Sequence, residues 1–114
     1  MRKTDKKIEN TIRQALTEVC ELALESVAGF KWLTHKVSDY KNLPETLSIL
    51  CVFETTDELS KALDTYQDVF MCRLIKEKLS VVNVDVKNIK QQVRFDSEEA
   101  CKIYHNSKWH ERFK

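Results

Sequence analysis

The segment VRFDSEEACKIYH (93–105) places a thiol, Cys101, one helical turn before an imidazole, His105. Side chains four residues apart on a helix are neighbours, so the two could form the nucleophile and base of a thiol enzyme. Such a thiol needs a lowered pKa. The acidic residues before it would raise that pKa, and a helix capped at Asp96 leaves Cys101 beyond the reach of the helix dipole. We interpret Cys101 as a packing thiol, and an enzyme using Cys101 and His105 remains an alternative function.

A second candidate chemistry is a metal site formed by carboxylates. Glu18, Glu21 and Glu25 follow one another at spacings of three and four residues in a segment that we expect to be a helix. Carboxylates in this pattern can bind a divalent cation, but a solvated helix face is the commoner reason for it. The chain has a single glycine, Gly29, which excludes glycine-rich phosphate loops and a G-x-S-x-G nucleophile motif. We expect no metal and no cofactor, and the metal site of this helix remains an alternative.

Basic residues near aromatic ones could instead bind nucleic acid, since they hold phosphates and stack bases. The chain carries 19 basic and 18 acidic residues and a formal net charge of +1, so only a local patch could do this. A nucleic-acid-binding transcriptional regulator acting through basic termini is therefore a further alternative. Its candidate contacts are Arg2, Lys3, Lys6, Lys7, Lys87, Lys90, Arg94, Lys108 and Arg112.

The composition predicts one globular domain covering residues 1–114. Hydrophobic residues make up 42% of the chain and charged residues 32%, which is typical of a chain with a packed core. The longest apolar stretch is strand-length, and no apolar secretory segment follows the basic N-terminus. The four cysteines form no C-x-x-C pair. We expect a cytoplasmic protein without a membrane partner.

Hydrophobic periodicity predicts the element order α-β-β-α-β-β-α. The first helix ends near Gly29, and the second begins at a capping box in which Thr55 bonds the amide of Glu58. This order favours an α+β fold with a small mixed or antiparallel four-stranded sheet packed by helices. The expected helices are 5–28, 56–80 and 97–105, and the expected strands are 30–37, 47–53, 81–86 and 90–95.

The second predicted helix is apolar on two sides. One stripe runs from Leu59 to Leu74, and the opposite side carries Met71, Ile75 and Leu79. A helix that is apolar all round must be buried all round. We therefore predict a homodimer with Met71, Ile75 and Leu79 at or near its interface, the alternative being that a C-terminal tail anchored by its aromatic residues covers them.

Three segments carry a resemblance to a known family: TDKKIENTIRQALTEVCELAL, FKWLTHKV and VRFDSEEAC. The chain resembles a family of short, largely uncharacterised bacterial proteins, some of which are labelled Fis-family transcriptional regulators. The resemblance covers nearly the whole chain and implies a bacterial cytoplasmic protein. No DNA-contacting residue of Fis falls on a matching position, so none is carried over. We expect a non-enzymatic protein-interaction or regulatory module whose protein partner the sequence does not identify.

Overall fold

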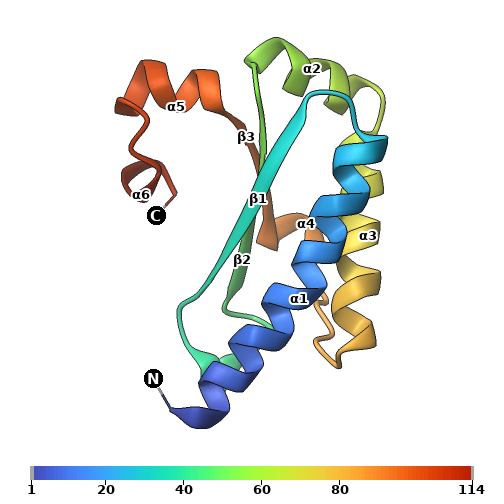
Figure 1. The fold of residues 1–114 in the computed structure, drawn as a ribbon, viewed down its shortest axis with the longest axis vertical. Helices are drawn as coiled ribbons and strands as arrows, with labels where there is room; N and C mark the ends of the chain where they lie inside the picture. Colours follow the sequence, from blue (N-terminus) through green and yellow to red (C-terminus); the bar gives the residue numbers. More distant parts are fainter. Residues whose placement is uncertain (1, 114) are drawn as a thin grey trace.

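The structure is a computed structural model that describes residues 2–113. The chain begins with a long helix and continues through two strands, a helical segment, a third strand and two short helices (Figure 1). The elements are α1 (Lys3–Ser26), β1 (Phe30–Val37), the 3₁₀ turn η1 (Tyr40–Asn42), β2 (Leu47–Phe53), α2 (Thr56–Asp64), α3 (Gln67–Val81), α4 (Ile89–Gln92), β3 (Val93–Ser97), α5 (Glu98–His105) and α6 (Trp109–Arg112).

The strands form one mixed sheet in the order β1-β2-β3. β1 and β2 are antiparallel, and β2 and β3 are parallel because α2 and α3 carry the chain back between them. The α+β class and the mixed sheet are therefore confirmed. Within residues 2–113 the sheet has three strands, and the prediction of four strands was wrong.

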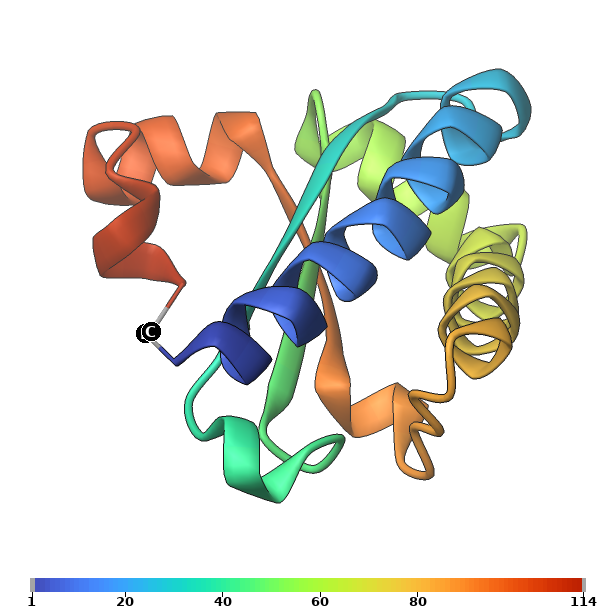
Figure 2. The same cartoon turned by 60° about the horizontal axis from the view of Figure 1, so that its bottom comes forward.

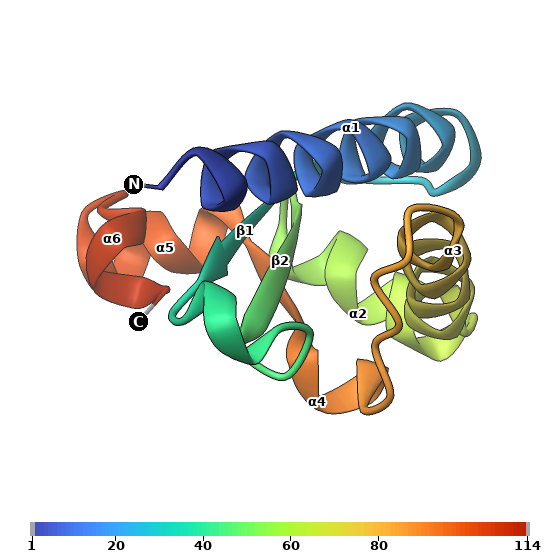
Figure 3. The same cartoon turned by 90° about the horizontal axis from the view of Figure 1, so that it is seen from below.

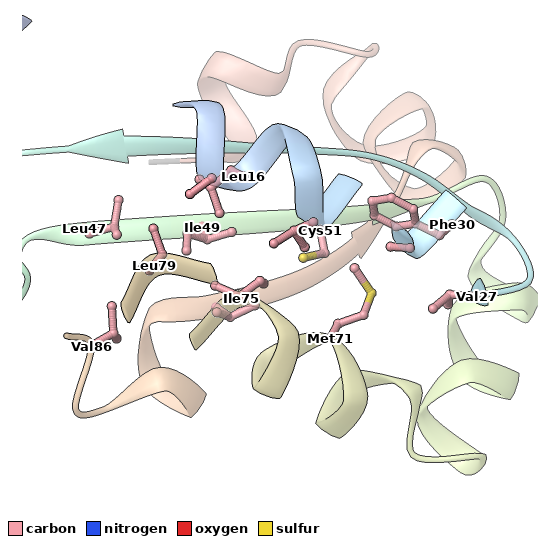
Figure 4. Packing of buried hydrophobic residues seen from close by; sticks show 14 of the residues in the cluster. Leu16, Val27, Phe30, Leu47, Ile49, Cys51, Met71, Ile75, Leu79 and Val86 are labelled. Atoms are coloured by element: carbon pink, nitrogen blue, oxygen red, sulfur yellow. The ribbon is translucent and has the colours of Figure 1, made fainter. Parts of the chain in front are cut away.

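The main core lies between the sheet and the pair α1 and α3 (Figures 1 and 3). Successive residues of a strand point to opposite faces, so alternate positions of β2 face these helices. Figure 4 shows Met71, Ile75 and Leu79 of α3 pointing toward Ile49 and Cys51 of β2. All five side chains have 0% exposed area, which accounts for the strongly apolar sequence of β2.

The other face of the sheet is covered by α5 and α6, on the side away from α1 and α3 (Figure 3). The rings of Trp32 and Trp109 meet edge to face at 5.1 Å between centroids, and the indole nitrogens of both donate to Glu98 Oε1. Lys36 Nζ donates to the carbonyl oxygen of Phe113 and lies 4.3 Å from its ring centroid. The aromatic residues of the tail thus pack back onto the chain, but on the face opposite to α3.

The predicted strand 81–86 is not a strand. Asn83 has a φ of +64°, which interrupts any extended segment, and the chain there forms a turn and a loop. The alternating apolar residues are explained by packing, since Val86 is 1% exposed and Val82 and Val84 lie against the core. The predicted strand 90–95 is divided into the short helix α4 and strand β3. Its carboxyl end extends two residues further, to Ser97.

The predicted helix 56–80 is broken in two. Thr55 accepts from the amide of Glu58 as expected, but α2 ends at Asp64 and Tyr66 takes a left-handed conformation with φ +61°. The break changes which side of the following helix faces the sheet. Residues of the expected core stripe become exposed, with Tyr66 at 74% and Phe70 at 38%, while Ile75 on the other side is fully buried.

Two further expectations concern helix ends. Gly29 follows α1 with φ +82°, as predicted from its position after the apolar stripe. The cap of the last predicted helix, assigned to Asp96, is instead Ser97, whose side chain accepts from the amide of Ala100. Asp96 is bound by Arg112, whose Nη2 donates to Oδ1 at 2.9 Å and whose Nε donates to Oδ2. A bidentate pair with arginine removes that carboxylate from capping.

Candidate interaction surface

A groove of about 450 Å³ separates α3 from the edge of the sheet. One wall belongs to α3, and the other belongs to α4 and β3, which lie beside α3 in Figure 2. The volume is within the range of sites that hold small ligands or side chains of a partner. The lining residues are Asp68, Val69, Cys72, Arg73, Lys76, Ile89, Lys90, Val93 and Phe95.

The apolar floor of the groove follows from the geometry of α3. At 100° per residue, Cys72 lies about 100° and Val69 about 160° around the helix from the core-facing Met71. Cys72 therefore lies at the margin of the core, against which it packs, and Val69, which is 41% exposed, points away from it toward the groove. Across the groove, Val93 and Phe95 alternate along β3 and point to the same face, Val93 being 5% exposed.

The rim of the groove is basic. Arg73, Lys76 and Lys90 are exposed, and none of them has a carboxylate within ion-pair distance among residues 2–113. Asp68 is the single acidic residue of the lining. Burial, followed by the charge of Asp68, raises the pKa of the Cys72 thiol, so this thiol is neutral at neutral pH. The groove thus combines an apolar floor with a net positive rim.

The groove also borders a free strand edge. β3 is the last strand of the sheet, and within residues 2–113 no further strand pairs with its outer side. Its register with β2 is regular over five residue pairs, whereas the opposite edge strand, β1, has an irregularity between Phe30 and Trp32. A bulge makes an edge strand less able to pair with another strand, and β3 has no bulge.

Gln92 fixes the position of the groove wall that α4 and β3 form. Gln92 Nε2 donates to the carbonyl oxygens of Pro44 and Leu47 at 2.7 and 2.8 Å. These bonds fasten the end of α4 to the start of β2 and place Lys90 beside the groove. The wall opposite α3 therefore has a defined position.

Cys101 and His105 have different surroundings in the structure. Cys101 is the buried residue of α5, and burial raises the pKa of its thiol. His105 Nδ1 lies 3.3 Å from Nη1 of Arg112, and no hydrogen bond joins His105 to Cys101 among the described side chains. A buried thiol with a raised pKa is a poor nucleophile.

The carboxylates predicted on the first helix lie along α1. Glu18 Oε2 is 3.3 Å from Lys78 Nζ on α3, while Glu21 and Glu25 are exposed. Within residues 2–113, no three histidine, cysteine, aspartate or glutamate side chains are grouped so that they could hold a metal ion. In the same part of the chain, no helix is both long and apolar enough to cross a bilayer.

The predicted nucleic-acid contacts are spread over several elements. Arg2, Lys3, Lys6 and Lys7 are exposed at the start of α1, Lys87 and Lys90 are exposed around the start of α4, and Lys108 is exposed before α6. Two others already have partners: Arg112 binds Asp96, and the Arg94 guanidinium lies 5.7 Å from the ring centroid of Phe113. Of the nine residues, Lys90 alone lines the groove.

Met71, Ile75 and Leu79 lie in the core of the single chain and not on its surface. Their burial is explained by β2 and α1, so the reason for placing them at a subunit interface is removed. The homodimer itself stays a prediction.

Sequence reasoning missed one partly buried polar cluster, which joins α1 to β1 and η1. His35 Nε2 and Glu9 Oε1 are 2.6 Å apart, and the Tyr40 hydroxyl donates to Glu9 Oε2 at 2.6 Å. Burial alone would raise the pKa of Glu9, but the hydrogen bond from Tyr40 and the nearby His35 and Arg13 outweigh it and lower that pKa. The hydrogen bond to Glu9 raises the pKa of Tyr40 to about 12. No sequence spacing links these residues, which are 26 and 31 positions apart.

Comparison of the chain with protein-family models, with curated proteins and with solved structures finds no match. The resemblance described above therefore remains an expectation, and the function has to be argued from the groove and its surroundings.

Proposed function

We propose that the chain is a non-enzymatic interaction module, and that it binds an acidic, partly apolar segment of a partner protein in the groove between α3 and β3. The observation that carries this proposal is the composition of the groove: an apolar floor of Val69, Cys72 and Phe95 surrounded by basic residues that have no ion-pair partner within residues 2–113.

Each part of the groove selects one property of the partner. Apolar side chains gain free energy by leaving water for the floor, at about 25 cal/mol per Å². The basic rim favours carboxylates next to those apolar groups and repels lysine and arginine, which gives specificity more than raw affinity. A segment in which acidic and apolar residues alternate satisfies both requirements.

The proposal is tested by fluorescence anisotropy with two labelled peptides of equal length, one alternating valine with glutamate and the other valine with lysine. We expect the acidic peptide to bind and the basic peptide not to bind. The double variant Arg73→Glu, Lys76→Glu should weaken binding of the acidic peptide about tenfold, or ~1.4 kcal/mol. The double variant Lys102→Glu, Lys108→Glu is the control with the same change of charge, because both residues are exposed, on α5 and just before α6, on the other side of the sheet.

A second pair of variants tests the floor. Val69→Trp places a large ring at the groove and should abolish binding, whereas Val81→Trp changes a 79% exposed residue that does not line the groove and should leave it unchanged. Equal binding of the acidic and basic peptides, or equal effects of the two tryptophans, would overturn the proposal. Tighter binding of a single-stranded oligonucleotide, kept in the Arg73 and Lys76 variant but lost in a Lys3→Glu, Lys6→Glu, Lys7→Glu variant, would instead favour the nucleic-acid alternative through the basic termini.

A further inference from the structure

We infer that the partner segment binds in an extended conformation and adds to the outer edge of β3 as a fourth strand of the sheet. This inference rests on the proposed function and specifies how the groove is used. It rests on two features that lie side by side, a regular strand edge with which no strand of residues 2–113 pairs and an apolar groove beside it.

The position of an added strand is determined by sheet geometry. Neighbouring strands lie about 4.8 Å apart, so a strand paired with β3 would run through the space between β3 and the overhanging side of α3. Alternate side chains of this strand would point toward Val69, Cys72 and Lys76, on the face where Phe95 lies. The intervening side chains would point to the other face, where the exposed Arg94 lies.

Both faces of such a strand would therefore meet a positive charge. Arg73, Lys76 and Lys90 surround the groove face, and Arg94 lies on the opposite face of β3. With apolar residues above the floor, the acidic residues of an alternating partner strand point to the face of Arg94, and the rim residues attract them at longer range. An extended acidic segment therefore fits this site better than an amphipathic helix does. The apolar side chains of such a helix would repeat every three or four residues along one face, and the helix would leave the backbone groups of β3 unpaired.

The length of the paired segment is limited at both ends. At one end, the Ser97 amide is bound by Asp96 Oδ1 at 2.8 Å and the Ser97 hydroxyl lies 3.0 Å from that of Thr56. At the other end, the chain before Val93 belongs to α4. The added strand thus pairs with about four residues, from Val93 to Asp96, which is short for a strand.

A second copy of the chain does not suit this edge. Two-fold pairing through β3 would bring the rims formed by Arg73, Lys76 and Lys90 against their own copies. Like charges at a contact oppose association. The occupant is therefore a segment with the opposite charge, supplied by a different protein.

The test uses backbone N-methylation of the alternating valine and glutamate peptide. In a strand only every second amide faces the neighbouring strand. Methylating one alternate set of amides should therefore reduce affinity more than tenfold, while methylating the other set should change it less than threefold. Amide hydrogen exchange of the full chain should show added protection within Val93–Asp96 on binding, and the Val69→Trp variant should show none.

The possible results distinguish a failure of strand addition from a failure of the proposed interaction module. If neither methylated peptide loses affinity while the acidic peptide still outbinds the basic one, strand addition is wrong and the interaction module stands. If the unmodified acidic peptide does not bind, the proposed function fails first. If the free chain forms a dimer by light scattering and the same β3 amides are protected in that dimer, a second copy occupies the edge and the inference is overturned.

Discussion

Replacing Ile75 by alanine tests the orientation of α3, which decides where both the core and the groove lie. Ile75 is fully buried against the sheet, whereas Phe70 on the side predicted to be the core is 38% exposed. Ile75→Ala removes three buried carbons at about 0.8 kcal/mol each, or about 2.4 kcal/mol, and the remaining cavity raises the loss to about 3 to 4 kcal/mol. For a chain of 114 residues, whose total stability is on the order of 5 to 15 kcal/mol, this is a large fraction.

The assay is urea unfolding followed by circular dichroism, and the quantity is the change in the free energy of unfolding. Phe70→Ala is the matched control on the opposite side of α3, and we expect it to cost less than Ile75→Ala despite the larger side chain. Ile75→Glu should prevent folding, because it leaves an unpaired charge in the core. A Phe70→Ala variant that loses more stability than Ile75→Ala would show that α3 turns the side of Phe70 and not the side of Ile75 toward the core. A folded, monomeric Ile75→Glu protein would revive the subunit interface at this residue.

Four further outcomes are expected. Gly29→Ala should destabilise the fold by roughly 1 to 3 kcal/mol, because the residue has φ +82° and a Cβ there would lie 2.6 Å from Glu58 Oε2. Adding Glu58→Ala should not restore this loss, because the Cβ that alanine retains at position 58 would lie 2.7 Å from the added Cβ. The pKa of Tyr40 is raised from 10.0 to about 12, so the stability contributed by its hydrogen bond to Glu9 should be complete below about pH 10 and lost as the pH rises through 12. The Tyr40→Phe variant should show neither this loss of stability nor the step in phenol absorbance near pH 12. The lowered pKa of Glu9 acts in the opposite range: its contribution is present above the ordinary value of 4.5 and disappears as the pH falls through the lowered value. Cys101 should react with iodoacetamide more slowly than free cysteine at pH 7 in the native protein, as identified by mass spectrometry; a faster reaction would favour the thiol-enzyme alternative.

Much of the local structure was readable from the sequence because it depends on neighbouring residues. Strands β1 and β2 have the predicted bounds, and α1 lies within two residues of its predicted range. The Thr55 cap and the left-handed Gly29 follow from the needs of helix ends, which residues a few positions apart can satisfy. The α+β class was likewise predictable from the order of periodic segments.

The errors lie where distant contacts compete with local preference. Residues 81–86 alternate as a strand should, yet they pack against the core as a loop. Asp96 is an acceptable cap, but Arg112, 16 positions away, binds its carboxylate and Ser97 replaces it. In both places the local pattern allowed two answers with nearly the same free energy, and tertiary contacts selected one.

The groove shows the same division. Its residues come from α3, α4 and β3, and their spacing in the sequence does not predict that Val69 and Cys72 line the same groove as Phe95. The sequence by itself determined which segments are helices and strands over most of the chain, and that Thr55 caps the helix after β2, because these depend on side-chain chemistry within a few residues. Only the tertiary structure decided that α3 turns Met71, Ile75 and Leu79 inward, that the sheet stops after three strands within residues 2–113, and that a basic, apolar-floored groove borders the free edge. The physical reason is that a single left-handed residue, Tyr66, rotates every side chain that follows it, and no periodicity in the sequence records that rotation.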